Sequence, residues 1–340
     1  MRLFACQECR NLLHFENVVC ASCSSALGYL PGPGVLSAFR DGKARADEKP
    51  WKNCANSVHG VCNWMLPVED ENEFCTACRH NRVVPDLSVE GNLPLWQKLE
   101  IAKRRLIYTL DRLRLPHDPE ELRFEFLADT PEHRVMTGHA DGLVTIALAE
   151  ADDAEREKRR NELHEPYRTL LGHMRHEVGH YYHTVLVERE GRTEEFRDLF
   201  GDETQDYAAA LKAHYDKPPS DDWRGEFISH YAAAHPHEDW AESFAHYLHM
   251  VDSLEMAASF GMSVRPRLDK EGVMEAEVDF NPYKASMEDI LLAWTPLTVA
   301  MNAMNRCMGT PDLYPFVLSD KVAEKLGFIH RIIQERPPLQ

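Results

Sequence analysis

The cysteines of this chain are concentrated near its N-terminus, and their spacing restricts what that segment can fold into. Eight of the nine lie within residues 6–78, and the first four form two C-x-x-C pairs, Cys6 with Cys9 and Cys20 with Cys23. Two tight turns at this distance can bring four thiolates around one tetrahedral zinc ion. The pattern therefore predicts a structural zinc site.

The other four N-terminal cysteines predict a second zinc site. They are Cys54, Cys62, Cys75 and Cys78. Only the last two form a C-x-x-C turn, so His59 and His80 are alternative ligands, and free cysteines in a small core are another interpretation. We expect two structural zinc ions in two ribbon-like modules.

The cysteine pattern also bears on the compartment. An odd number of cysteines, tight pairs and an N-terminus without an apolar signal region favour metal binding in a reducing compartment over disulfides. No uninterrupted apolar stretch approaches the roughly 20 residues that a membrane helix needs. We expect a cytoplasmic protein with no membrane partner.

Charge is unevenly distributed along the 340 residues. The net charge is −2 over residues 1–90 and −16 over residues 91–340. A phosphate backbone would repel the larger segment, whereas the nearly neutral N-terminal segment would not. Together with the cysteines, this contrast predicts a zinc-binding domain at 1–90 and a larger domain at 91–340.

Hydrophobic periodicity predicts a mixture of helices and strands in the larger domain. Apolar residues recur every three or four positions over residues 93–113, which indicates a helix, and alternate over residues 122–128, which indicates a half-buried strand. Residues 135–150 read as a hairpin with Asp141 and Gly142 at its turn. We expect an α+β fold.

The stretch HMRHEVGHYYH contains the arrangement H-E-x-x-H, in a helix that we expect to start near Glu165 and Pro166. Two of its residues, His176 and His180, lie one turn apart and can aim two imidazoles at one ion. Glu177 lies beside them and can take a proton from water bound to that ion.

Two further histidines flank this motif. His173 and His183 fall on the same side of the helix but lack a glutamate at the matching offset. We expect them to line a pocket or face solvent rather than to bind metal.

A catalytic zinc site needs a third protein ligand and an open position for water. Downstream, His235 and Pro236 begin a second predicted helix. Glu238 and Glu242 lie four residues apart on one face of it, which suits one metal ligand and one acceptor that orients a metal-bound imidazole. Taken alone, Glu238 would only cap the helix and Glu242 would be solvated.

These motifs together resemble a family of bacterial zinc-dependent metallopeptidases that carry an N-terminal zinc-ribbon domain. The resemblance rests on CQEC, CASC, CNWMLP, GHADGLVTIALAEAD, EPYRTLLGHMRHEVGHYYH and HPHEDWAESFAHYLH. It implies a zincin of the gluzincin type, in which a glutamate on a later helix completes the H-E-x-x-H site. His176, His180 and Glu238 would then hold one catalytic zinc.

The segment YAAAHPHEDWAESF is also similar to the active-site segment of anthrax lethal factor. That similarity implies that Tyr231 stabilises the oxyanion, that Glu238 is the third ligand and that Glu242 lies behind the ligands. A tyrosine packed in the core is the alternative for Tyr231. Three histidines are rivals for its role: His230, His235 and His237.

The family resemblance also implies a fold. Residues 91–340 would form a zincin-like domain, a small twisted sheet with helices, after small β zinc-ribbon modules in residues 1–90. The edge strand beside the active-site cleft would be residues 142–150, where an extended substrate could pair.

The function predicted from these features is zinc-dependent hydrolysis of peptide bonds in a peptide or protein substrate. Glu177 would be the general base. An alternative is a binding module, in which the zinc ribbons recognise a protein or nucleic acid and the larger domain is an inactive scaffold. A DNA-associated repair protease is a third interpretation, disfavoured because such proteases usually place the ribbon last and use a third histidine.

Two segments carry no chemical motif. Residues 188–229 join the two predicted ligand helices and would form a cleft wall, a lid or a helical insertion. Residues 287–309 predict a buried helical region that is kinked or bounded at Pro296. We expect its methionines in the core and Cys307 as a buried thiol.

Overall fold

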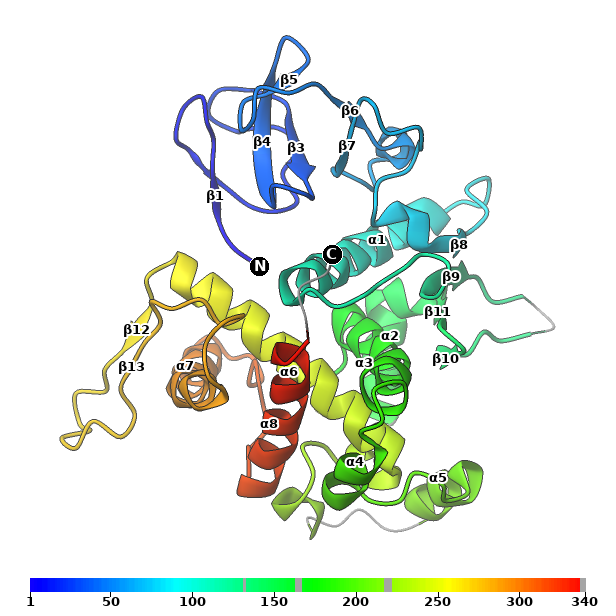
Figure 1. Cartoon of the computed structure of the whole chain (residues 1–340), viewed down its shortest axis with the longest axis vertical. Coiled ribbons are helices and arrows are strands. Elements are labelled where there is room, and N and C mark those ends of the chain that lie inside the picture. The colour runs from blue at the N-terminus through cyan, green and yellow to red at the C-terminus, as the bar shows by residue number, and fades with distance from the viewer. Residues whose placement is uncertain (131–132, 163–166, 217–221, 337–340) are drawn as a thin grey trace. The chain divides into compact units, whose positions relative to one another are not determined.

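The protein is described by a computed structural model that covers residues 1–130, 133–162, 167–216 and 222–336 (Figure 1). The chain divides into two compact units. The first consists of Met1–Arg112 and Pro116–Arg159, and the second of Leu113–Leu115 and Arg160–Gln340. Both helices and sheets are present, in agreement with the predicted α+β class.

The cysteine-rich segment of the first unit contains three small antiparallel sheets. They pair β1 with β2, β3 with β4 and β4 with β5, and β6 with β7. Their strands are β1 (Phe4–Ala5), β2 (Leu12–Leu13), β3 (Leu27–Leu30), β4 (Val35–Arg40), β5 (Lys43–Ala44), β6 (Trp51–Asn53) and β7 (Met65–Pro67). Strands this short cannot bury a large core, which is why a bound metal is expected to stabilise such modules.

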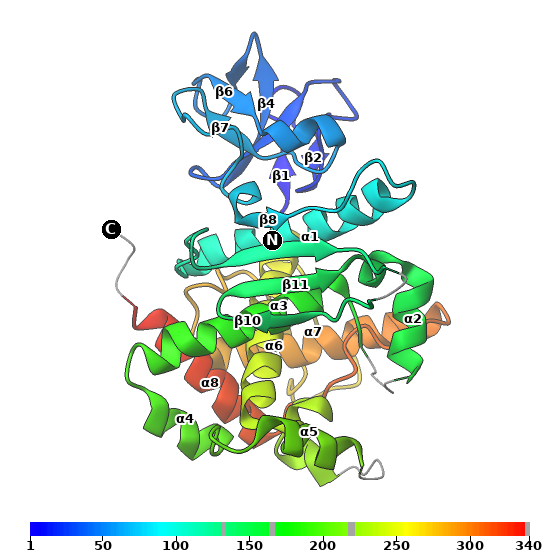
Figure 2. The ribbon, with the colours of Figure 1, turned by 90° about the vertical axis from the view of Figure 1, so that its right-hand side faces the viewer.

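The first unit also contains a four-stranded sheet (Figure 2) with the order β10-β11-β9-β8. Its strands are β8 (Asn81–Val83), β9 (Arg123–Leu127), β10 (Gly138–Ala140) and β11 (Leu143–Ala147). Phe124 and Phe126 are buried and Arg123 is exposed, as the alternating pattern predicts. Asp141 and Gly142 both have positive φ, as the turn of a tight hairpin requires.

One expectation about this sheet is wrong. The strand predicted at its edge, within residues 142–150, is β11, which pairs with β10 on one side and with β9 on the other. Strand β11 pairs antiparallel with β10, its hairpin partner, and parallel with β9 on its other side. The edge strands of the described sheet are therefore β10 and β8, and β11 is an interior strand.

Two helices complete the first unit, α1 (Asn92–Leu113) and α2 (Asp153–Glu162). The apolar stripe predicted for residues 93–113 is buried, including Leu99, Leu106 and Leu110. Lys103 of α1 lies over the ring of Phe126, so α1 covers one face of β9.

The second unit is mainly helical. It contains α3 (Leu170–His183), α4 (Thr193–Phe200), α5 (Tyr207–Tyr215), α6 (Pro236–Ser259), α7 (Met287–Cys307), α8 (Asp320–Gln334) and a hairpin of β12 (Ser263–Val264) and β13 (Ala276–Glu277). Helix α6 is the longest of these and packs against α3, α7 and α8 (Figure 1). Its burial explains why its sequence is apolar on more than one face.

Helix α3 begins later than predicted. The predicted start at Glu165 and Pro166 lies outside the described residues, and the helix begins after Thr169, whose side chain accepts a hydrogen bond from the Gly172 N–H at 3.0 Å. After His183 the chain continues as one π-helical turn, Thr184–Glu188. Residues 188–229, for which the sequence predicted a cleft wall, a lid or a helical insertion, contain α4 and α5.

Helix α7 runs through Pro296. Its buried side chains end at Thr298, and its last turns face outward. The expectations of a buried Cys307 and of core methionines are therefore wrong, because Cys307, Met304 and Met308 are exposed. Among the described residues, no helix combines the length and apolar character needed to cross a membrane.

Candidate metal centres and catalytic site

Helix α3 brings the two motif histidines together. His176 and His180 lie one turn apart, and their Nε2 atoms are 3.3 Å from one another. The opposite stripe of the helix anchors it, since Met174, Val178 and Tyr181 are buried. The two imidazoles therefore project from a fixed helix toward the same point.

Helix α6 supplies the carboxylate predicted as the third ligand. His235 caps the helix, Pro236 occupies its first position, and Glu238 follows in the first turn. The Oε2 atom of Glu238 lies 2.9 Å from His176 Nε2 and 3.7 Å from His180 Nε2. Two helices far apart in sequence thus meet at this point.

A glycine allows these helices to approach. A Cβ atom at Gly179 would lie 3.0 Å from the Cα of Ala241 in α6. Trp240 also donates its indole N–H to the carbonyl of Gly179 at 2.8 Å. The fourth residue of the HEVGH motif is therefore fixed by helix packing rather than by metal chemistry.

The donor atoms of His176, His180 and Glu238 all lie within 4.8 Å of one another. Glu238 is almost completely buried, and its Oε2 atom faces the two imidazole nitrogens. Two imidazole nitrogens and one carboxylate oxygen match the donor set of a catalytic zinc site. A buried carboxylate oxygen facing two imidazoles also requires a cation or protons, and zinc supplies that charge.

Electrostatics favour the ionised form of this carboxylate. Burial acts to raise the pKa of Glu238, but the neighbouring His176 and His180 outweigh it and lower the pKa to about 2. The group is therefore an anion at neutral pH and available to a metal.

The second carboxylate of α6, Glu242, lies behind His176. Its Oε1 atom is 2.7 Å from His176 Nδ1, and its Oε2 atom accepts a hydrogen bond from the Ser229 hydroxyl at 2.6 Å. This arrangement orients the imidazole and directs its Nε2 toward the point shared with His180. Ser229 was not among the residues predicted from sequence.

Glu177 follows His176 in the same helix. Burial raises the pKa of Glu177 to about 7, and the charges of Glu238 and Glu242 act in the same direction while His176 opposes them. A carboxylate whose pKa lies near neutrality suits proton transfer in both directions.

Tyr231 begins a short 3-10 helix, Tyr231–Ala234, just before α6. Its ring centroid lies 5.8 Å from that of His176. Burial raises the pKa of Tyr231 well above its ordinary value, so the phenol keeps its proton. It is thus placed beside a predicted ligand as a hydrogen-bond donor.

The three histidines considered as rivals of Tyr231 have other contacts. His230 is exposed and its ring packs on His214, at 4.2 Å between centroids. His235 accepts the N–H of His237 at 3.1 Å as the helix cap, and His237 packs on His183. None of the three belongs to a group of possible ligands among the described residues.

The two histidines that flank the motif, His173 and His183, do not belong to the group of possible metal ligands. His183 is buried against Phe196 and His237, and its Nδ1 lies 3.3 Å from Glu188. His173 is half-buried. Neither joins His176 and His180 in the group of close donor atoms.

Tyr207 touches the site although no sequence motif marks it. Its hydroxyl donates to Oε1 of Glu238 at 2.6 Å. Tyr207 is the first residue of α5, within the segment for which the sequence suggested a cleft wall, a lid or an insertion.

Both predicted groups of four cysteines converge. In the first, Cys6 and Cys23 lie 3.7 Å apart and Cys9 and Cys20 lie 3.6 Å apart, measured between their Sγ atoms. Within each group, the four Sγ atoms lie within 4.8 Å of one another. Such spacing fits four thiolates around one zinc ion.

The second group is formed by cysteines alone: Cys54, Cys62, Cys75 and Cys78. All four are buried. The alternative ligand His80 instead places Nδ1 at 2.7 Å from the carbonyl of Leu122, and His59 packs beside Trp96. Neither histidine takes part in this group.

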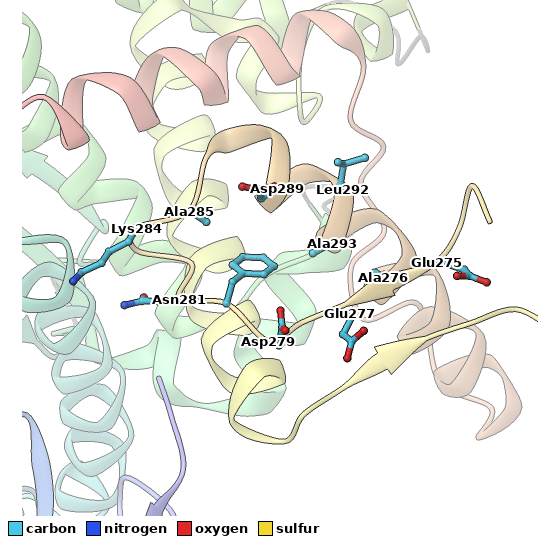
Figure 3. Close-up of a pocket in the computed structure, with 11 residues that line it drawn as sticks. Glu275, Ala276, Glu277, Asp279, Asn281, Lys284, Ala285, Asp289, Leu292 and Ala293 are labelled. Atoms are coloured by element: carbon cyan, nitrogen blue, oxygen red, sulfur yellow. The ribbon is translucent and has the colours of Figure 1, made fainter. Parts of the chain in front are cut away.

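A separate groove of about 590 Å³ lies in the second unit between β13 and the start of α7 (Figure 3). Phe280 and Leu292 contribute apolar surface to it, and Glu277 and Asp279 contribute carboxylates. Glu277 is already paired with Arg265 at 3.3 Å. No residue predicted for metal binding or catalysis lines this groove.

The three groups of possible metal ligands define a metal-binding protein. Residues 92–332 match the family described as "Putative zinc-binding metallo-peptidase", and residues 3–89 match a zinc-ribbon domain family. Since the first match spans well over half of the chain, the chain belongs to this zinc-binding metallo-peptidase family and carries an N-terminal zinc-ribbon domain.

Full-length relatives are found in mycobacteria. The chain is 40% identical over 346 residues to an uncharacterized protein of Mycobacterium bovis and to uncharacterized proteins of two Mycobacterium tuberculosis strains. Each alignment covers 99% of this chain and 97% of the relative. No solved structure matches the chain.

Proposed function

We propose that this protein is a zinc-dependent peptidase that hydrolyses peptide bonds in a peptide or protein substrate. The observation that carries the proposal is the meeting of His176, His180 and Glu238, with their donor atoms within 4.8 Å, beside Glu177. A purely structural zinc site has four protein ligands, whereas three leave a position open for water or substrate.

Each of the chain's own groups has a role in this proposal. His176, His180 and Glu238 would hold the zinc, which lowers the pKa of water and polarises a carbonyl when bound. Glu177 accepts the proton of the attacking water and delivers it to the leaving amine, as a carboxylate with a pKa near 7 can do. Tyr231 donates to the oxyanion of the substrate, a contact worth about 3 kcal/mol in comparable sites.

The finer classification follows from the third ligand. With Glu238 in that position the site is of the gluzincin type, and we propose a zincin-like domain at 91–340 after a zinc-ribbon domain at 1–90. The family matches at 92–332 and 3–89 support this division. The protein would then bind one catalytic and two structural zinc ions, in a reducing compartment such as the cytoplasm where thiolates persist.

The alternative, a protein- or nucleic-acid-binding zinc ribbon with an inactive scaffold, leaves Glu177 without a purpose. A buried carboxylate costs free energy to ionise, and a scaffold would gain nothing from placing one beside two metal ligands. We therefore place hydrolysis first and assign any partner contacts of the ribbons a secondary role.

The test combines zinc content with turnover. Elemental analysis of the purified chain should give three zinc ions in the wild type and two in Glu238→Ala. Glu177→Gln should keep three while hydrolysis of a quenched fluorescent peptide library falls at least about 100-fold. Glu194→Gln, an exposed residue of α4, is the matched control and should behave as wild type.

Two outcomes would overturn the proposal. Two zinc ions in both the wild type and Glu238→Ala would mean that the cysteine groups hold all the metal. Wild-type hydrolysis by Glu177→Gln would remove the general base from the mechanism.

A further inference from the structure

The two oxygen atoms of Glu238 have different surroundings. Oε2 faces the imidazoles, at 2.9 Å from His176 Nε2 and 3.7 Å from His180 Nε2. Oε1 instead accepts the hydroxyl of Tyr207 at 2.6 Å. One oxygen is therefore directed to the metal-binding point, and the other is already occupied.

This division has a chemical consequence for a catalytic site. A carboxylate can bind a metal through one oxygen or through both, and binding through both uses an additional coordination position. A hydrolytic zinc site must leave a position open for water. A donor fixed on Oε1 favours binding through Oε2 alone and so preserves that position.

Tyr207 is itself held in place by neighbouring groups. It is the first residue of α5, where the Asp206 side chain caps the helix by accepting the N–H of Ala209 at 3.0 Å. Its ring packs edge-on against His235, with centroids 5.2 Å apart. The Nε2 atom of His235 lies 3.3 Å from the carbonyl of Gln205. The cap of α6 and the start of α5 are thus tied together beside Glu238.

We propose that Tyr207 is a positioning residue for the third zinc ligand: its hydroxyl orients the Glu238 carboxylate so that Oε2 alone binds the metal. The inference rests on the proposed function, because it assumes zinc between the two histidines and Glu238. It also links metal binding to a segment outside the motif helices, since α5 contacts the ligand through this hydroxyl.

The decisive variant is Tyr207→Phe, which removes the hydroxyl and keeps the ring that packs on His235. We expect zinc at the His176, His180 and Glu238 site to bind about 10- to 100-fold more weakly, as is typical when a group that orients a ligand is lost. The measurement is chelator competition on the full chain. The two cysteine groups serve as an internal standard because their zinc should be unaffected.

Lys212→Gln is the control. It changes an exposed side chain of the same helix, which pairs with the exposed Asp216 just after the helix. Zinc affinity in this control should equal that of the wild type. Equal affinity in Tyr207→Phe and the wild type would overturn the assignment.

Hydrogen exchange gives a second measurement that does not depend on activity. In the wild type, removal of the catalytic zinc should raise amide exchange across α5, because the carboxylate that Tyr207 contacts loses its metal. In Tyr207→Phe the same removal should change α5 much less. An identical response of α5 in both proteins would contradict the link.

The outcomes of these experiments distinguish a wrong role for Tyr207 from a wrong proposed function. If the wild type holds a third zinc that Glu238→Ala loses, while Tyr207→Phe binds it normally, only the role of Tyr207 is wrong. If the wild type holds no third zinc, both the proposed metal centre and the proposed role of Tyr207 are wrong.

Discussion

The Nδ1 atom of His176 lies 2.7 Å from Oε1 of Glu242, at the rear of the proposed metal centre. A carboxylate in this place holds the proton on Nδ1 and leaves the Nε2 lone pair for a metal. The Ser229 hydroxyl in turn fixes the other oxygen of Glu242 at 2.6 Å. The orientation of the His176 imidazole thus depends on two residues that would not touch a bound metal.

The first prediction concerns Glu242. Replacing it with Ala should weaken zinc binding about 10- to 100-fold, because His176 loses its orienting acceptor. Glu242→Gln should lose less, since the amide oxygen still accepts a hydrogen bond. Chelator competition measures both, with Glu288→Ala at an exposed site of α7 as control. Full affinity in Glu242→Ala would show that helix packing alone orients His176.

The second prediction concerns Gly179. Its substitution by Ala places a Cβ 3.0 Å from the Cα and 3.1 Å from the carbonyl oxygen of Ala241, so the α3–α6 packing must open. We expect the free energy of unfolding to fall by about 1–3 kcal/mol, measured by urea denaturation, together with weaker zinc binding.

A second glycine offers a control, because its substitution by Ala should not lower the free energy of unfolding. Gly327 lies within α8, and a Cβ there would meet no atom within 4 Å. Gly327→Ala should therefore leave stability unchanged or raise it by up to about 1 kcal/mol. Equal effects of the two substitutions would show that helix propensity, rather than close packing, decides the result at Gly179.

The sequence alone could predict what lies within one helix. The spacing of His176 and His180 and the apolar stripe on the far side of α3 both follow from the helical period. The same reasoning located the start of α6 at His235 and Pro236. Pairing Glu238 with the histidines rested on its helix face, on the need for a third ligand and on the family resemblance, because no local pattern relates residues on different helices.

The contacts of Tyr207 and Ser229 could not be predicted in this way. Both belong to connecting segments without a chemical motif, and their roles arise only when the chain folds back onto α6. The wrong expectation for Cys307 has a related cause. An apolar pattern indicates that a helix can be buried, but how far along α7 its neighbours extend is a tertiary property.

The third prediction concerns the two cysteine groups. All four cysteines of the second group are buried, whereas in the first group Cys23 is exposed and Cys9 is half-buried. A chelator should therefore remove zinc from the first group faster. In Glu238→Ala, which lacks the proposed catalytic zinc, this gives two kinetic phases in a colorimetric assay. Cys9→Ser should abolish the fast phase, and Cys307→Ser, outside both groups, should change neither. Loss of the slow phase in Cys9→Ser would show that the first cysteine group, and not the second, releases its zinc slowly.

The fourth prediction concerns acid stability. His246 is buried with its Nδ1 atom 2.7 Å from the Tyr314 hydroxyl, and burial lowers its pKa from 6.5 to about 4. The folded protein therefore prefers neutral His246. Its contribution to stability is present above pH 6.5 and is lost as the pH falls toward 4.

For one such group the loss between pH 7 and pH 5 is about 2 kcal/mol. Burial likewise lowers the pKa of His183 to about 4, so His183 acts in the same direction. Urea denaturation of the zinc-loaded protein at both pH values should show a smaller drop in His246→Gln than in the wild type, because the variant cannot take up this proton. Protonation of the proposed zinc ligands affects both proteins alike and cancels in the comparison. An equal drop would mean that His246 is already protonated, or already accessible to water, in the folded protein.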